Sequence, residues 1–236
     1  MKRIILPLII FFNSLFFLYA DEGTVFCIHG FLRSPRCMKP LARALEQKGL
    51  HSVLWDYPSR ARTIEEHAEF LVGEIKKIAA ESPGKPIHFV SHSLGGLIIR
   101  AALNHPDCPN EAKIGRALLL APPNKGSRMA RNIRDLPGIR FIFGNKAGMQ
   151  LLTYDQKDID SLGHFPEEME VCVVAGSRGN PIAHFWLKEP NDGKVTVRET
   201  TLPTPHYHFI FSINHTWIMT HKRTILLAIS FLTSPG

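Results

Sequence analysis

The stretch HFVSHSLGGLI, residues 88–98, places a serine between a run of β-forming residues and a pair of glycines. This pattern indicates a buried strand that turns sharply into a helix, with Ser93 at the apex of the turn. So tight a turn strains the apical residue and needs small neighbours two positions before and after it. Ser91 and Gly95 meet that need. Because such a turn lifts the Ser93 hydroxyl clear of the backbone, Ser93 is a candidate nucleophile.

The rest of the chain alternates short apolar runs with helical patterns, which predicts an α/β fold with a mostly parallel central sheet and helices on both faces. Strands are expected at 24–29, 51–57, 86–91, 115–123 and 169–177, and within part of 206–215. Helices are expected at 37–48, from Thr63 to Ile78, at 95–104 and at 224–231. The second of these is the clearest, because Thr63 and Glu66 form a capping box at its start.

Length and hydropathy divide the chain into a leader and one domain. Of the 236 residues, 44% are hydrophobic, which suits a single α/β core. Residues 1–20 carry two basic residues ahead of an apolar run at 4–19, the pattern of a secretory signal peptide. We therefore expect an exported protein, periplasmic or secreted, with one α/β domain at 21–236. A retained N-terminal anchor is the alternative, since Leu18 stands where cleavage sites ordinarily have a small residue.

Charge and cysteine content narrow the partners. The formal charge is +7, and no block of Lys and Arg resembles a nucleic-acid patch, so no nucleic acid is expected. Cys27 and Cys172 lie in strand-like apolar runs and are expected to be buried thiols. Cys37 and Cys108 lie near element ends, where an exported chain can pair them, although the sequence does not fix connectivity. No C-x-x-C spacing is present, which disfavours a zinc or redox site.

Between residues 124 and 168 the periodic pattern loosens, as in an insertion between two strands. Residues 124–150 carry six basic side chains and one acidic side chain, which are Lys125, Arg128, Arg131, Arg134, Arg140, Lys146 and Asp135. Apolar residues are interleaved with them, namely Met129, Ile133, Leu136, Ile139, Phe141 and Phe143. The segment is either a lid over a site or a solvated amphipathic excursion.

A serine hydroxyl needs a base within hydrogen-bond reach and an acid that orients the base. Asp192 is the candidate acid, because it follows a predicted strand and precedes Gly193, which permits a sharp loop. His215 is the candidate base, because it follows a strand-like run and precedes the last helix. The alternatives are Asp155, Asp158 and Asp160 for the acid and His206, His208 and His221 for the base.

The motif CIHGF, residues 27–31, ends an early strand in a His-Gly pair. Such a pair lets a following backbone N–H point into the site. With the N–H of Leu94 it would form an oxyanion hole. A glycine that only turns the chain is the alternative.

Five stretches, in order, resemble the α/β-hydrolase fold lipases and esterases, especially bacterial lipase-like and GPI-inositol-deacylase-like hydrolases. They are IHGF, SHSLGG, LLLAPPNKGS, NDGKVTV and NHTWIM, within residues 24–223. The resemblance implies Ser93 as nucleophile, Asp192 as acid and His215 as base, with the N–H groups of Phe31 and Leu94 as the oxyanion hole. One departure from the pattern of that family is Ser91, where many relatives have glycine.

The expected protein is an exported serine hydrolase that cleaves carboxylic esters, including lipid acyl esters, through an acyl-Ser93 intermediate. No metal and no organic cofactor are implied. The basic and apolar residues of 124–150 suggest peripheral contact with a membrane surface. An amidase, thioesterase or acyltransferase would use the same residues, and a non-catalytic binding protein on a hydrolase scaffold is a further alternative.

Overall fold

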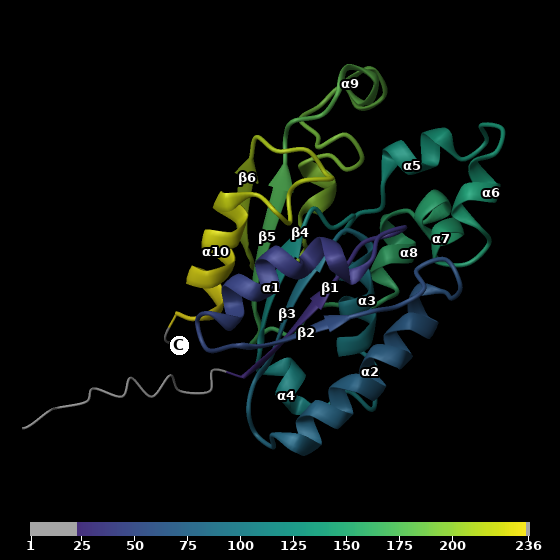
Figure 1. Ribbon diagram of the computed structural model, residues 1–236. Helices are drawn as coiled ribbons and strands as arrows, with labels where there is room; N and C mark the ends of the chain where they lie inside the picture. Colours follow the sequence, from purple (N-terminus) through teal and green to yellow (C-terminus); the bar gives the residue numbers. More distant parts are fainter. Residues whose placement is uncertain (1–22, 235–236) are drawn as a thin grey trace, which may run out of the picture.

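The computed structural model describes residues 23–234 and is built on a six-stranded sheet (Figure 1). The signal peptide expected at 1–20 lies outside the described residues. Across the sheet the order is β2 (His51–Trp55), β1 (Thr24–Ile28), β3 (Ile87–His92), β4 (Arg116–Leu120), β5 (Glu170–Gly176) and β6 (Tyr207–Phe211). Every neighbouring pair is parallel, which confirms the predicted α/β sheet.

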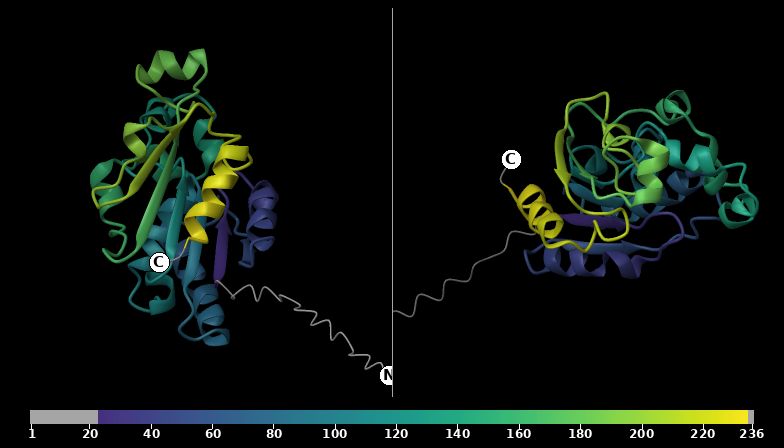
Figure 2. Two further views of the ribbon diagram at one scale, coloured as in Figure 1. Left: turned by 90° about the vertical axis from the view of Figure 1, so that its left-hand side faces the viewer. Right: turned by 90° about the horizontal axis from the view of Figure 1, so that it is seen from above.

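Helices cover both faces of the sheet, as the sequence predicts (Figures 1 and 2). One face is covered by α1 (Lys39–Glu46) and α10 (Lys222–Leu232), and the other by α2 (Ile64–Glu81) and α3 (Leu94–Leu103). Strand β1 shows why both faces need to be covered, because its apolar side chains alternate between the two faces and pack in two separate cores. Val25 and Cys27 pack in the core with α1 and α10, whereas Phe26 and Ile28 pack in the core with α2 and α3.

The start of α2 is fixed by the capping box that the sequence predicts. The Thr63 hydroxyl accepts a hydrogen bond from the Glu66 N–H at 3.1 Å, and the Glu66 carboxylate accepts one from the Thr63 N–H at 2.7 Å. Two N–H groups that the first turn would leave unpaired are thereby satisfied. Ile64, Leu71 and Ile75 on this helix are buried against the sheet and α3.

All four cysteines are free thiols, so the structure does not contain the Cys37–Cys108 pair that the sequence left open. The physical reason is their position relative to the sheet. Cys37 packs against the core with α1 and α10, whereas Cys108 is buried in the core with α2 and α3. Cys27 and Cys172 are buried as expected, and burial raises the pKa of each thiol to about 12.

The insertion between β4 and β5 contains four short helices, grouped beyond the ends of the strands (Figure 1). They are α5 (Arg128–Ile133), α6 (Ile139–Phe143), α7 (Ala147–Thr153) and α8 (Gln156–Asp160). Each has seven residues or fewer, too few for a clear helical period, which explains the loosened sequence pattern.

The remaining elements are short. They are η1 (Pro35–Met38), α4 (Asn110–Lys113), α9 (Pro181–Leu187) and η2 (Arg198–Thr200). Figure 2 shows α9 at the end of the molecule toward which the strands run, set apart from the sheet. Within residues 23–234, no helix is both long enough and apolar enough to cross a lipid bilayer.

Candidate active site

The predicted turn is present between β3 and α3, with Ser93 at φ 53° and ψ −119°. A non-glycine residue in this region is strained, and such strain is concentrated at functional sites. Gly95 permits the turn, because a Cβ there would lie 2.8 Å from Ile28 Cγ2 and 3.0 Å from the Ile28 carbonyl oxygen. The Ser93 N–H donates to the Leu120 carbonyl oxygen at 2.9 Å and ties the turn to β4.

Ser91 stands where many of the hydrolases that the sequence resembles have glycine, and the turn forms nevertheless. Its side chain is fully buried in β3, which pairs with Ile28 of β1 and Leu119 of β4 at this position. The Ser91 hydroxyl has no hydrogen-bond partner among the described residues. The Ser91 hydroxyl is therefore a small buried group with no contact that indicates a catalytic role, and unlike Ser93 it does not line the cavity described below.

Asp192 and His215 come together through their side chains and their backbones. His215 Nδ1 lies 2.7 Å from Asp192 Oδ2, and the two residues are 5% and 2% exposed. The other oxygen, Asp192 Oδ1, accepts the backbone N–H groups of Lys194 and Val195 at 2.9 and 2.8 Å. The His215 N–H also donates to the Asp192 carbonyl oxygen at 2.9 Å. A carboxylate beside Nδ1 holds the ring proton there, which leaves Nε2 available as a base.

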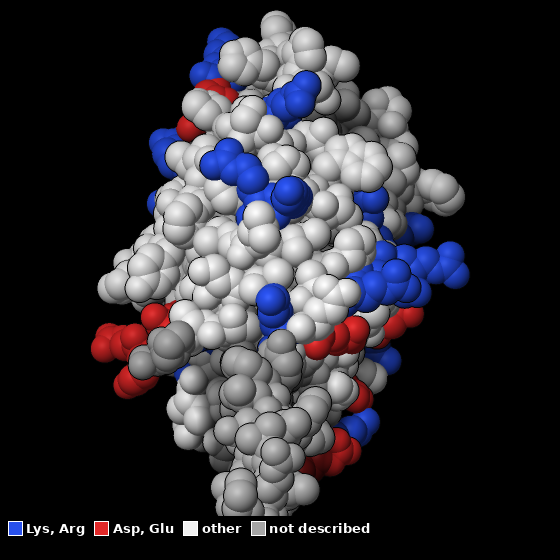
Figure 3. All heavy atoms as spheres, turned by 60° about the vertical axis from the view of Figure 1, so that its left-hand side comes forward, with Lys and Arg blue, Asp and Glu red and all other residues white. Residues whose placement is uncertain are grey.

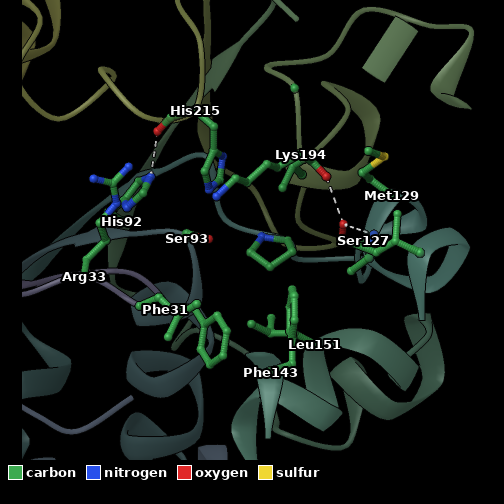
Figure 4. Close-up of a pocket in the computed structure, with 16 residues that line it drawn as sticks. Phe31, Arg33, His92, Ser93, Ser127, Met129, Phe143, Leu151, Lys194 and His215 are labelled. Carbon is green, nitrogen blue, oxygen red and sulfur yellow. Dashed lines mark hydrogen bonds between the residues drawn. The ribbon is translucent and has the colours of Figure 1, made fainter. Parts of the chain in front are cut away.

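Ser93 and His215 line one cavity of about 490 Å³ at the ends of the strands (Figure 4). Phe31, Phe143 and Leu151 lie together along one side of this cavity, and His215 lies on the opposite side with Ser93 between them. This volume and this largely apolar wall are typical of a small-molecule or lipid site.

The loop that carries Phe31 presses against the Ser93 turn. A Cβ on Gly30 would lie 2.6 Å from His92 Nδ1 and 3.1 Å from Ser93 Cβ, so only glycine allows this approach. The Tyr57 hydroxyl donates to the His29 carbonyl oxygen at 2.7 Å and anchors the loop.

Neither the Phe31 N–H nor the Leu94 N–H has a hydrogen-bond partner in the part of the chain that the structure describes. Leu94 is the first residue of α3, where backbone N–H groups have no partner inside the helix. Both donors predicted for the oxyanion hole are thus available.

The alternative acids are engaged elsewhere. Asp155 and Asp158 form the capping box of α8. Asp160 accepts a hydrogen bond from Arg100 Nη2 at 2.8 Å. None of the three lines the cavity that holds Ser93.

The alternative histidines have local partners as well. The His206 ring lies 2.8 Å from the Thr204 carbonyl oxygen, and His208 Nε2 lies 2.9 Å from the Thr200 hydroxyl. His221 caps the start of α10. Of the four candidate histidines, His215 is the one that lines the cavity.

His92 is a feature of the site that sequence reasoning missed. It is buried, and its Nε2 lies 2.9 Å from the His215 carbonyl oxygen, with ring centroids 4.6 Å apart. Burial, and then the charge of His215, hold the pKa of His92 well below its usual value. The neutral ring therefore donates to that carbonyl and joins the nucleophile's turn to the loop of the base. The only signal in the sequence is its position beside Ser93.

The insertion supplies part of the cavity wall. Met129, Ile133, Phe143 and Leu151 line the cavity, and the Phe143 ring stacks on Phe31 with centroids 5.1 Å apart. Other apolar residues of the segment face solvent, with Phe141 85% exposed. The segment therefore borders the candidate site, which is compatible with the lid interpretation.

Several basic side chains of the insertion already have partners. Arg128 pairs with Glu189, Arg131 Nη1 donates to the Tyr154 carbonyl oxygen at 2.9 Å, and Lys146 lies 3.4 Å from Glu66. The net charge of the segment thus overstates the number of cations that are free to meet an external anion.

Comparison with known proteins agrees with this geometry. A family model described as the alpha/beta hydrolase family matches residues 25–222. No curated protein matches the chain. The mature form of Bacillus licheniformis lipase BlEst2 superposes with a TM-score of 0.76 and 19% identity, covering 91% of this chain and 94% of that chain.

Two further solved structures are similar at low sequence identity. The metagenomic carboxyl esterase MGS0156 gives a TM-score of 0.68 at 17% identity, covering 89% of this chain and 74% of that chain. Aspergillus fumigatus lipase B gives a TM-score of 0.68 at 15% identity, covering 91% of this chain and 53% of that chain. With the matched model spanning most of the described residues, the chain belongs to the alpha/beta hydrolase family.

Proposed function

We propose that this protein is a serine hydrolase that cleaves carboxylic esters, including lipid acyl esters, through an acyl-Ser93 intermediate. The observation that carries the proposal is that Ser93 and His215 line one cavity, with His215 Nδ1 2.7 Å from Asp192 Oδ2. A nucleophile, a base and an orienting acid are the parts that acyl transfer requires. The lipase and esterase names of the superposed structures support the choice of an ester as substrate.

In the proposed reaction, Ser93 Oγ forms a bond to the ester carbonyl carbon while its proton passes to His215 Nε2. The negative charge that develops on the carbonyl oxygen is stabilised by the N–H groups of Phe31 and Leu94. The bond to the alcohol then breaks, and the alcohol leaves with the proton from His215. Asp192 keeps the ring oriented and stabilises the imidazolium.

A water molecule completes the cycle. It gives a proton to His215 Nε2 and attacks the acyl carbon, and the second tetrahedral intermediate collapses. Ser93 Oγ recovers the proton as the carboxylic acid is released. His215 returns each of the two protons that it accepts, and water is the one reactant needed besides the ester.

The apolar wall favours an acyl chain as the part of the substrate held beside Ser93. Phe31, Met129, Phe143 and Leu151 border the cavity. Beyond it, α6 and α9 expose apolar side chains, with Phe141, Ile182 and Phe185 each more than two thirds exposed. We extend the proposal to contact with a lipid surface through these helices, because exposed aromatic and aliphatic side chains insert at such interfaces.

Export belongs to the same proposal, and it rests on the signal-peptide pattern of residues 1–20 alone. A periplasmic or secreted enzyme would meet its lipid substrates outside the cytoplasm.

Labelling with a fluorophosphonate tests the proposal directly. The wild-type protein should gain one adduct, mapped by peptide mass to Ser93, and Ser93→Ala should gain none. Ser91→Ala is the matched control, because it removes a neighbouring hydroxyl without touching the candidate nucleophile, and it should be labelled as the wild type is. An adduct on another serine, or equal labelling of Ser93→Ala, would contradict the proposal.

An acyl-chain series of esters, run beside matched amides and thioesters, separates the proposed reaction from amidase, thioesterase or acyltransferase chemistry on the same residues. We expect the esters to be hydrolysed fastest. Faster turnover of the amides or thioesters would indicate an amidase or a thioesterase instead of an esterase. A protein that resists labelling and cleaves none of them would be a binding protein on this scaffold.

A further inference from the structure

Two cationic residues, Arg33 and Lys194, line the cavity that holds Ser93 and His215. Both residues are exposed. Neither forms an ion pair with an acidic side chain of residues 23–234. None of the sixteen residues that line the cavity is an aspartate or glutamate. The residues that line the cavity therefore carry a net positive charge, which the adjacent Asp192 carboxylate offsets only in part.

Lys194 is held at the cavity by its backbone. Its N–H donates to Asp192 Oδ1 at 2.9 Å, and its carbonyl oxygen accepts from the Ser127 hydroxyl at 2.9 Å. The nearby carboxylate is already engaged, because Asp192 Oδ2 is bonded to His215 and Oδ1 accepts two backbone N–H groups. In Figure 4 the Lys194 side chain lies on the same side of the cavity as His215.

Arg33 is held on the other side of the site, beside His92 (Figure 4). The backbone N–H of Arg33 donates to the Gly30 carbonyl oxygen at 3.2 Å, and the backbone N–H of Leu32 donates to the Ser59 hydroxyl at 3.0 Å. These bonds fix the turn that follows the predicted oxyanion loop. The arginine therefore starts from a defined position next to the nucleophile's turn.

The two charges act on the same small region. Desolvation of the Lys194 amino group by the protein around it, and then the positive charge of Arg33, lower the pKa of Lys194, whereas the charge of Asp192 acts in the opposite direction. The charges of Lys194 and Arg33 also contribute to the low pKa of His92. The effect of Arg33 on Lys194 shows that the two like charges repel each other, and a bound anion would relieve that repulsion.

The cavity is thus amphipathic. Phe31, Phe143 and Leu151 lie along one side, and Lys194 lies across from them (Figure 4). On the face of the molecule shown in Figure 3, acidic residues lie mainly in the lower half, whereas Lys and Arg also occupy the upper half, toward which the strands run. An apolar chain and an anionic group on one molecule would match both features of the cavity.

We propose that the cavity selects esters that carry an anionic group, a phosphate or a carboxylate, a few bonds from the scissile carbonyl. Arg33 and Lys194 bind the anion while the apolar wall holds the acyl chain. The inference rests on the proposed ester hydrolysis and names its substrate class. An ester of an anionic glycerol phosphate and an ester of a hydroxy acid share this chemistry.

Matched soluble esters test the selectivity. The first pair is monooctanoylglycerol and its phosphomonoester, and the second is the octanoyl ester of ethylene glycol and that of glycolate, all kept below their aggregation limits. The wild type should show a higher kcat/KM for the anionic member. Arg33→Gln and Lys194→Gln should each reduce that preference about threefold to tenfold, the range for one charge-assisted contact that is partly exposed.

The two pairs separate the sources of the anion. A preference in both pairs assigns recognition to negative charge in general, and a preference in the first pair alone assigns it to phosphate. Arg36→Gln and Lys188→Gln are the control variants, because both residues are exposed and neither lines the cavity. They should keep the wild-type preference. Added salt should weaken the preference of the wild type and leave the neutral esters less affected.

A binding measurement separates failure of this inference from failure of the proposed reaction. Octyl phosphate and octanol are titrated into Ser93→Ala by calorimetry. We expect octyl phosphate to bind more tightly and to lose that advantage in Ser93→Ala combined with Lys194→Gln. Ester turnover without any anion preference, or equal binding of the two ligands, would overturn the inference. If the protein binds the anionic ligand more tightly but hydrolyses no ester, the anion site is supported and the proposed reaction is contradicted.

Discussion

The turn region and the insertion border the same cavity, but they are built differently. Ser93, His92, Asp192 and His215 lie near the strand ends, where each is held by a hydrogen bond to or from the backbone, and three of the four are buried. The insertion of residues 124–168 is a set of short helices that meets the cavity through apolar side chains and exposes residues such as Phe141. We therefore expect the strand ends to carry the proposed chemistry and the insertion to contact the acyl part of the substrate.

Of the changes that compare an acidic residue in each region, the largest effect should come from the acid beside the strand ends. Asp192→Asn is expected to lower kcat by about four orders of magnitude, because the amide no longer holds the His215 proton on Nδ1. The measurement is steady-state hydrolysis of a soluble ester. Asp155→Asn is the matched control in the insertion, since asparagine also caps a helix, and it should retain activity within a few fold. Full activity in Asp192→Asn with loss in Asp155→Asn would reverse the assignment of the two regions.

A second effect concerns acid stability of the buried region. Burial, together with the charge of Arg62, lowers the pKa of His67 from 6.5 to about 4 in the folded protein. His67 is 1% exposed beside Tyr57, which anchors the predicted oxyanion loop. Between those two pH values the unfolded chain binds a proton that the folded protein does not, so stability falls as pH decreases through this window. A shift of this size corresponds to about 3 kcal/mol.

His67→Phe should therefore flatten the decline in the free energy of unfolding between pH 6.5 and about 4, as measured by chemical denaturation at several pH values. An unchanged slope in the variant would show that His67 is not the source of the decline.

A third effect separates two glycines. Gly95→Ala should destabilise the protein by about 1–3 kcal/mol, because the new methyl group would meet Ile28 in the packed turn. Gly73→Ala in α2 adds a methyl group where no atom lies within 4 Å, and it should stabilise the protein by up to about 1 kcal/mol. Urea denaturation measures both. Equal effects of the two changes would show that the turn is not sterically constrained.

The smallest effect should come from the exposed part of the insertion. Phe141→Ser removes a ring that is 85% exposed, so it should change stability by less than about 0.5 kcal/mol and leave turnover of a dispersed short ester unchanged. On anionic vesicles that carry a long-chain ester, turnover should fall several fold if α6 contacts the lipid surface. Equal activity of the wild type and Phe141→Ser on vesicles would show that Phe141 in α6 does not contribute to contact with the lipid surface.

The sequence predicted the turn between β3 and α3 well, because the signals for such a turn are local. The strand before Ser93, the glycine two residues after it and the capping box at Thr63 each require particular residue types at fixed spacing, and the structure has all three. The choice of Asp192 and His215 rested on their following late strands, and the structure places them in contact. The Ser-His-Asp assignment itself stays a prediction until it is tested.

Other features depend on contacts that no local pattern encodes. The bond from His92 to the His215 carbonyl joins residues 123 positions apart in the chain. The Phe143 ring of the insertion stacks on Phe31, a residue far away in the sequence, and the helices of the insertion are too short to appear as periodicity. Cys37 and Cys108 looked alike in sequence because nothing local shows that a sheet lies between them.

The central claim is that Ser93 and His215 act as one catalytic unit beside the strand ends. A double-mutant cycle on kcat tests it most directly. Ser93→Ala and His215→Ala are each expected to lower kcat by about six orders of magnitude, and the double variant should be no slower than either. Residues that share one step show this non-additivity, since removing one partner already abolishes what the other contributes. Losses that multiply in the double variant, or substantial activity in either single variant, would contradict the account.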